Sequence, residues 1–100
     1  MKPKAIQIVV SEKVKDRLER ECQKRDLSRR DLFIEALEKF RKKHKSNYIP
    51  KHAEIDRVYY FNYSVRLFRE TVNELDKLSE RLDIQRSVLV REIVCEYINE

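Results

Sequence analysis

The sequence of 100 residues contains no glycine, and this absence excludes whole classes of ligand site. Phosphate loops and dinucleotide-binding fingerprints need glycine, because only a residue without a Cβ atom lets the backbone come so close to a phosphate. Glycine is also the usual residue for left-handed turns between helices. Asp26 and Asp83 tolerate that conformation better than most residues, and we expect them at the two helix-helix turns.

Cysteine, histidine and long apolar runs are scarce as well. Cys22 and Cys95 fall within apolar helix faces, which favours buried free thiols over a disulfide scaffold. His44 and His52 lack zinc-ligand spacing, so we expect no metal and no cofactor. No apolar run approaches the roughly 18 residues of a membrane span, and no signal-peptide pattern follows Met1. We therefore expect a soluble, cytoplasmic protein with no membrane partner.

Charge is abundant and unevenly placed. Residues 1–45 carry 15 Lys and Arg against 8 Asp and Glu, whereas residues 46–100 carry 8 against 10. The halves thus have net charges of +7 and −2, and the total of +5 favours an anionic partner. The basic run from Arg41 to Lys45 has two interpretations: a nucleic-acid patch, or positive charge that complements a helix C-terminus and solvates a linker.

Sliding the sequence along itself, until Leu27 falls on Ile84, reveals an internal repeat. The same shift places Arg29 over Arg86 and Leu32 over Leu89, and each half reads as strand, helix, turn, helix. We predict a first repeat at residues 1–45, a linker at 46–57 that contains Pro50, and a second repeat at 58–100. Each half alone is too small to hold a core, so the two should form one compact domain.

Strict alternation at residues 61–67 predicts a strand with one apolar and one polar face. The apolar face consists of Phe61, Tyr63, Val65 and Leu67. The other face carries Asn62, Ser64 and Arg66, whose side chains are suited to hydrogen bonds with base edges in a major groove. The equivalent strand of the first half points Ile6, Ile8 and Val10 one way and Ala5, Gln7 and Val9 the other. One strand cannot stand alone, so we expect the two to pair.

Helices should follow each strand. Ser11 and Ser28 are good N-caps in the first half, whereas Phe68 and Gln85 stand in their places in the second half. The third helix therefore begins either directly after Phe68 or later, at a capping box formed by Thr71 and Glu74. The apolar helix positions form four core stripes, namely Val14, Leu18 and Cys22; Leu32, Phe33, Ala36, Leu37 and Phe40; Val72, Leu75, Leu78 and Leu82; and Val88, Leu89, Ile93, Val94, Tyr97 and Ile98.

This order, with second helices that open on Ser28-Arg29-Arg30 or Gln85-Arg86-Ser87, resembles the ribbon-helix-helix family of Arc, MetJ and CopG repressors. The resemblance covers nearly the whole chain, twice. It implies a mainly α fold with a two-stranded antiparallel β-ribbon, in which tandem ribbon-helix-helix copies form an intramolecular pseudo-dimer. The family usually has glycine where Asp26 and Asp83 stand, and a negative charge there weakens a phosphate clamp unless it points away.

The same resemblance assigns the contacts with DNA. The base-contacting positions are Ala5, Gln7, Val9, Asn62, Ser64 and Arg66. The N-termini of the second helices hold phosphate through backbone N–H groups, and the short basic arm at the start of the chain adds charge. The phosphate-contacting set is then Lys2, Lys4, Ser28, Arg29, Arg30, Gln85, Arg86 and Ser87.

These patterns favour a sequence-specific, double-stranded DNA-binding transcriptional regulator, repressor-like, that inserts a β-ribbon into the major groove. No acid-base pair is suggested, so we expect neither an enzyme nor a small-molecule substrate. One alternative is an antitoxin of a toxin–antitoxin pair, although the sequence stops directly after the last helix and offers no tail for a toxin. A second is a protein-interaction module with degenerate DNA binding. Self-association of pseudo-dimers on DNA is left open.

Overall fold

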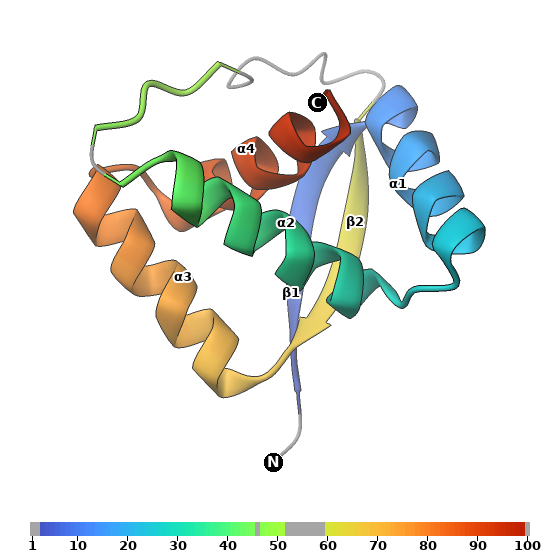
Figure 1. The fold of residues 1–100 in the computed structure, drawn as a ribbon, viewed down its shortest axis with the longest axis horizontal. Coiled ribbons are helices and arrows are strands. Elements are labelled where there is room, and N and C mark those ends of the chain that lie inside the picture. Colours follow the sequence, from blue (N-terminus) through green and yellow to red (C-terminus); the bar gives the residue numbers. More distant parts are fainter. Residues whose placement is uncertain (1–2, 46, 52–59, 100) are drawn as a thin grey trace.

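A computed structural model of the chain describes residues 3–45, 47–51 and 60–99. It is mainly helical, with one two-stranded antiparallel sheet (Figure 1). The elements run in the order β1 (Lys4–Ser11), α1 (Glu12–Arg25), α2 (Arg29–Lys43), β2 (Tyr60–Leu67), α3 (Arg69–Leu82) and α4 (Arg86–Ile98). The order of strand, helix, turn and helix predicted for each half is therefore confirmed.

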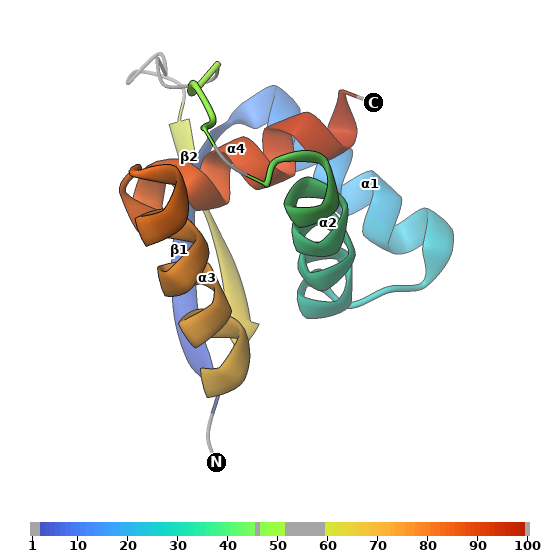
Figure 2. The same cartoon turned by 60° about the vertical axis from the view of Figure 1, so that its left-hand side comes forward.

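The two strands pair along their whole length and form a ribbon. Lys4 lies opposite Leu67 and Ser11 opposite Tyr60, with each pair between them in step. The even-numbered residues of β1 and the odd-numbered residues of β2 turn toward the helices, and α2 and α4 cross that face of the ribbon (Figures 1 and 2). The buried positions of the ribbon are Ile6, Ile8, Val10, Tyr63, Val65 and Leu67.

Phe61 departs from the prediction that it lies in the core. It is on the expected face of β2, opposite Val10, but 38% of its surface is exposed. The reason is its place near the start of the strand, where α1 has just left the ribbon and the ammonium group of Lys15 lies 5.0 Å from the ring centroid. A cation over the face of an exposed ring is favourable.

The helix ends follow local rules in the first half. Ser11 and Ser28 accept hydrogen bonds from the backbone N–H groups of Val14 and Asp31, at 3.3 and 3.1 Å. Asp26 and Asp83 adopt left-handed backbone angles, with φ of 53° and 56°, as their position in a chain without glycine predicted. Their turns close in the same way in both halves: the next residue donates its backbone N–H to a carbonyl in the last turn of the helix.

The second half reaches the same geometry without capping side chains. Phe68 and Gln85 occupy the N-cap positions, and neither side chain makes a capping hydrogen bond. Even so, α3 begins at Arg69, so the later start at Thr71 is wrong. The backbone angles of Phe68, φ −71° and ψ 158°, nearly equal those of Ser11, φ −73° and ψ 162°. The packing of α3 against the core, through Val72, Leu75, Leu78 and Leu82, holds the helix start in place.

Part of the predicted linker belongs to the core. Tyr48 is 7% exposed, and its ring stacks on His44 at 4.5 Å and packs against Phe40 at 4.9 Å. The Tyr48 hydroxyl donates a 2.8 Å hydrogen bond to Glu92, whose side chain is fully buried in α4. Burial is the main reason that the pKa of Tyr48 lies well above its ordinary value. The segment after α2 therefore ties the first half to the second. The remainder of the predicted linker, residues 52–57, lies outside the described residues.

None of the helices in the described ranges has the length and apolar character needed to cross a bilayer.

Candidate nucleic-acid interface

The six residues predicted to contact bases lie together on the face of the ribbon that points away from the helices. They form three cross-strand pairs: Ala5 with Arg66, Gln7 with Ser64, and Val9 with Asn62. Val9 and Ser64 are half-buried and the other four are exposed. The amide of Gln7 donates a 3.2 Å hydrogen bond to the Ser64 hydroxyl across the ribbon. The resulting strip carries amide, hydroxyl and guanidinium groups together with the apolar side chains of Ala5 and Val9, and groups of these polar kinds match the donor and acceptor patterns of base edges.

The central pair of this strip has a special position. Gln7 and Ser64 are strand partners, and they are also equivalent positions of the internal repeat, related by the shift that places Leu27 over Ile84. The pair that joins Ala5 to Arg66 then lies at one end of the strip, and the pair that joins Val9 to Asn62 lies at the other. One end therefore carries a guanidinium and the other a carboxamide, so the two ends differ in chemistry.

A groove lies beside the ribbon at the N-terminus of α2. It has a volume of about 470 Å³ and is lined by Ser28, Arg29, Arg30, Ser64 and Arg66. Ser28 caps the helix, and its hydroxyl is occupied by the N–H of Asp31. The structure thus brings three predicted phosphate-contacting residues next to two predicted base-contacting residues. An anion placed here meets guanidinium groups and the positive end of the helix dipole.

Arg29 also ties α2 to β2. One guanidinium nitrogen donates a 3.2 Å hydrogen bond to the carbonyl of Ser64, and the group lies 4.6 Å from the centroid of the Tyr63 ring. Glu19 of α1 pairs with the same guanidinium. Arg29 therefore holds the N-terminus of α2 against the ribbon, between the predicted phosphate-contacting and base-contacting residues. Arg30 lies over the exposed ring of Phe68, 4.7 Å from its centroid.

The N-terminus of α4 forms the matching groove at the other side of the ribbon. It has a volume of about 310 Å³ and is lined by Lys4, Ala5, Ile6, Gln7, Arg86, Ser87 and Val90. Arg86 pairs with Asp76 at 3.2 Å, just as Arg29 pairs with Glu19 one repeat earlier. Gln85 precedes the helix and is exposed, and its side chain makes no capping bond. Lys2 lies outside the described residues.

The two grooves differ in charge. The α2 groove has three arginines among its lining residues, whereas the α4 groove has Lys4 and Arg86. Each groove has one arginine that is already paired with a carboxylate. The surplus of positive charge therefore lies at the α2 side, where Arg66 of the second half joins Arg29 and Arg30 of the first.

The described cysteines and histidine take part in packing. The Cys22 sulfur lies 3.8 Å from the buried Tyr63 hydroxyl, and burial raises the pKa of the Cys95 thiol to about 11. His44 contacts Glu96 at 2.7 Å. Within residues 3–45, 47–51 and 60–99, no three His, Cys, Asp or Glu side chains gather in a way that would hold a metal ion.

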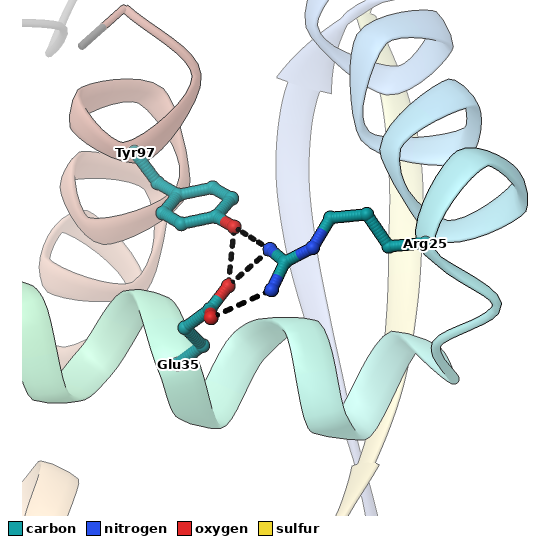
Figure 3. Close-up of polar contacts among 3 residues, drawn as sticks. All are labelled: Arg25, Glu35 and Tyr97. Atoms are coloured by element: carbon teal, nitrogen blue, oxygen red, sulfur yellow. Dashed lines mark hydrogen bonds and ion pairs between the residues drawn. The ribbon is translucent and has the colours of Figure 1, made fainter.

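One polar cluster was missed by the sequence analysis. Arg25 at the end of α1, Glu35 in α2 and Tyr97 in α4 contact one another (Figure 3). A guanidinium nitrogen donates to Glu35 at 2.8 Å, and another donates to the Tyr97 hydroxyl at 2.6 Å. The hydrogen bonds from Arg25 and then from Tyr97 lower the pKa of Glu35 to about 2. A sequence signal for this cluster was present in the spacing of opposite charges across the helix-helix turns. Arg25 and Glu35 have the same separation along the chain as Glu19 and Arg29, and as Asp76 and Arg86.

Comparison with protein-family models, curated protein sequences and solved structures gives no match for this chain.

Proposed function

We propose that this chain is a sequence-specific, double-stranded DNA-binding protein that regulates transcription by inserting the β1–β2 ribbon into the major groove. The observation that carries the proposal is the outward strip of six residues from Ala5 to Arg66, with a helix N-terminus and its groove on either side. The groups proposed to read bases and those proposed to bind phosphate thereby share one surface.

The dimensions of the ribbon support this proposal. A major groove about 12 Å wide admits a two-stranded ribbon. The two strands of eight residues present their polar strip outward, while the opposite face is buried under the helices. The ribbon therefore keeps its hydrophobic core when the strip enters a groove.

The flanking helices supply contacts with the backbone of the duplex. The first N–H groups of α2 and α4 have no partner within their own helices, and they carry partial positive charge. Arg30 and Ser87 lie in the grooves beside them. Contacts with phosphate on both sides of the ribbon fix its orientation, and the strip then reads the bases between them.

The repeat and the strand register together support a tandem ribbon-helix-helix pseudo-dimer. A two-fold axis relating the halves must pass between Gln7 and Ser64, since these strand partners are also repeat equivalents. Ala5 is then equivalent to Asn62, and Val9 to Arg66. Because neither pair of equivalent residues matches, the two ends of the ribbon meet different bases, and the preferred site within one chain's footprint is not a palindrome.

The test is a comparison of Arg66→Ala with Arg81→Ala on DNA selected from a random pool. Both variants remove one exposed arginine, but Arg81 is on α3, away from the strip. Loss of a bidentate contact with guanine costs about 1 to 3 kcal/mol and relaxes the preference at one base pair. Arg81→Ala should keep the base preference. Equal effects of the two variants, or an unchanged preference in Arg66→Ala, would refute the proposed reading surface.

A further inference from the structure

A second basic surface lies on the helical side of the molecule. It is a groove of about 520 Å³ between α1, α2 and the end of α4, beside the cluster of Figure 3. Five cationic side chains and one carboxylate contribute to its lining: Arg17, Arg20, Lys24, Arg25 and Lys39, with Glu21. Arg25 is paired with Glu35, but no hydrogen bond or ion pair within the described part of the chain occupies Arg17, Arg20 or Lys24.

This groove is separate from the proposed DNA interface. Glu19, which pairs with Arg29 beside the ribbon, lies two residues from both Arg17 and Glu21. Residues two apart on a helix point about 200° away from each other, so these side chains leave α1 on the opposite flank. Figure 3 shows Arg25, Glu35 and Tyr97 in front of the helices' side of the ribbon, with the strands behind them.

The corresponding place in the second half is covered by the chain itself. Glu92 is the repeat equivalent of Glu35, and Tyr97 is that of Phe40. There Tyr48 packs on Phe40 and donates its hydroxyl to Glu92, and the backbone N–H of Lys51 donates to Glu92 at 2.7 Å. A non-helical stretch of chain, residues 47–51, thus covers the part of this equivalent place that contains Phe40 and Glu92, whereas the groove beside Tyr97 and Glu35 is open.

The charges of the two places differ at two lining positions and agree at two others, where Lys77 and Arg81 stand for Arg20 and Lys24. In the covered place, Glu74 and Glu96 stand where the open groove has Arg17 and Lys39. The end of α2 and the stretch that follows it are basic: residues 41–51 contain five Lys and Arg and no Asp or Glu, and Arg41 and His44 contact Glu74 and Glu96. The carboxylates of that place are therefore matched by basic residues. The open groove, whose lining has five cations and one carboxylate, is complementary to an acidic segment.

The spread of the cations favours a peptide over a single small anion. From Arg17 to Lys24, α1 rises about 10 Å, which is the length of about three extended residues. Glu92 accepts a hydrogen bond from the Tyr48 hydroxyl, and Glu35 accepts the equivalent hydrogen bond from the Tyr97 hydroxyl. A segment that binds in the open groove therefore does not need to provide an aromatic residue. What the groove lacks is enough negative charge to balance its cations, since Glu21 is the one carboxylate among the described residues of its lining.

We propose that this groove binds an extended acidic peptide segment of a partner protein. The contacts would join carboxylates of that segment to Arg17, Arg20, Lys24 and Lys39. The proposal does not depend on DNA binding, because the groove and the ribbon strip lie on different faces.

The test uses a fluorescein-labelled peptide of alternating Glu and Ser, without DNA, in fluorescence anisotropy with the full chain. The variant is Arg20→Glu with Lys24→Glu, and the matched control is Lys77→Glu with Arg81→Glu at the equivalent positions of the second half. All four residues are exposed, so both variants should fold, and both change the net charge equally. We expect the first variant to bind the peptide about tenfold more weakly, and the control to bind it like the original protein.

Four results would overturn the proposal. The first is no binding of the peptide by the original protein at low salt, and the second is equal weakening in both variants, which would mean attraction by net charge alone. The third is displacement of the labelled peptide by inorganic tripolyphosphate at a lower concentration than by unlabelled peptide, which would make the groove a phosphate site. Duplex binding is measured in parallel: equal affinities of the two variants are expected, and a selective loss in Arg20→Glu with Lys24→Glu would assign the groove to DNA instead.

Discussion

Tyr48→Phe removes a single oxygen and should nevertheless destabilise the whole fold. The Tyr48 hydroxyl donates its hydrogen bond to a carboxylate of Glu92 that is fully buried, and the tyrosine itself is 7% exposed. Water cannot easily replace the lost donor at such a depth. The phenylalanine ring keeps the packing against Phe40 and His44, so the change isolates the hydrogen bond from the aromatic contacts.

The magnitude follows from the burial and the charge of the acceptor. A hydrogen bond to a charged group contributes about 1.5 to 3 kcal/mol, and an acceptor left short of a donor in the core loses most of it. We therefore expect the free energy of unfolding to fall by about 2 kcal/mol. In a domain of this size that lowers Tm by about 8 to 16 °C. Thermal melts followed by circular dichroism, together with urea titrations, measure both quantities.

Tyr97→Phe is the matched control. Tyr97 also donates its hydroxyl to a glutamate, and that residue, Glu35, is the repeat equivalent of Glu92. The side chain of Glu35 is 34% exposed, so solvent screens the contact and can replace the lost donor. We expect a loss below about 1 kcal/mol. If the two variants melt together, or if Tyr48→Phe melts like the original protein, burial of Glu92 is not what gives the Tyr48 contact its strength.

Four further predictions concern the ribbon, the charges and the two halves. The triple substitution Ala5→Asn, Gln7→Ser and Val9→Arg makes the two ends of the ribbon identical. DNA selection should then return a palindrome, and a second arginine contact should add about 1 to 3 kcal/mol of affinity. An unchanged site would contradict the proposed axis. The affinity for selected DNA should fall with salt at a log-log slope near −5 for about six phosphate contacts, and a slope near zero would exclude DNA as the partner. Because the folded-state pKa of Glu35 is lowered from 4.5 to about 2, its contribution to stability is present above pH 4.5 and lost as pH falls toward 2; Glu35→Gln should flatten the acid limb of the stability curve in that window, and an unchanged limb would contradict this. Residues 1–45 expressed alone should show no cooperative melt, since a half of this size buries too little surface to offset chain entropy, and a monomeric two-state transition would refute this.

Local rules predicted most of the helix and strand positions. The alternation of apolar and polar residues predicted the two strands of the ribbon, and a serine before each apolar stripe predicted the starts of α1 and α2. These signals depend on only a few adjacent residues. The left-handed turns at Asp26 and Asp83 could also be predicted, because the chain has no glycine to adopt that conformation. The start of α3 could not be predicted, because Phe68 offers no capping group and the fold imposes the backbone angles there.

What could not be predicted depends on contacts between distant parts of the chain. Glu92 looks in the sequence like any charged helix residue, and its burial depends on Tyr48, which is far away in the chain in a stretch without periodicity. The candidate interface was predicted more fully. Its six strip residues lie on one face of the ribbon, which alternation predicts for each strand. The structure adds the two flanking grooves and the hydrogen bond by which Arg29 holds the α2 N-terminus against β2.

The pairing of β1 with β2 inside a single chain also determines how the ribbon can change over generations. In a ribbon assembled from two copies of one subunit, every substitution appears at both ends at once, so a gain at one end is tied to whatever it does at the other. Here Val9 and Arg66, or Ala5 and Asn62, are encoded separately, and each can mutate without its counterpart. Subunit exchange with a related protein cannot mix the strands either, because both strands remain on the same chain at a high effective concentration whatever the amount of protein in the cell.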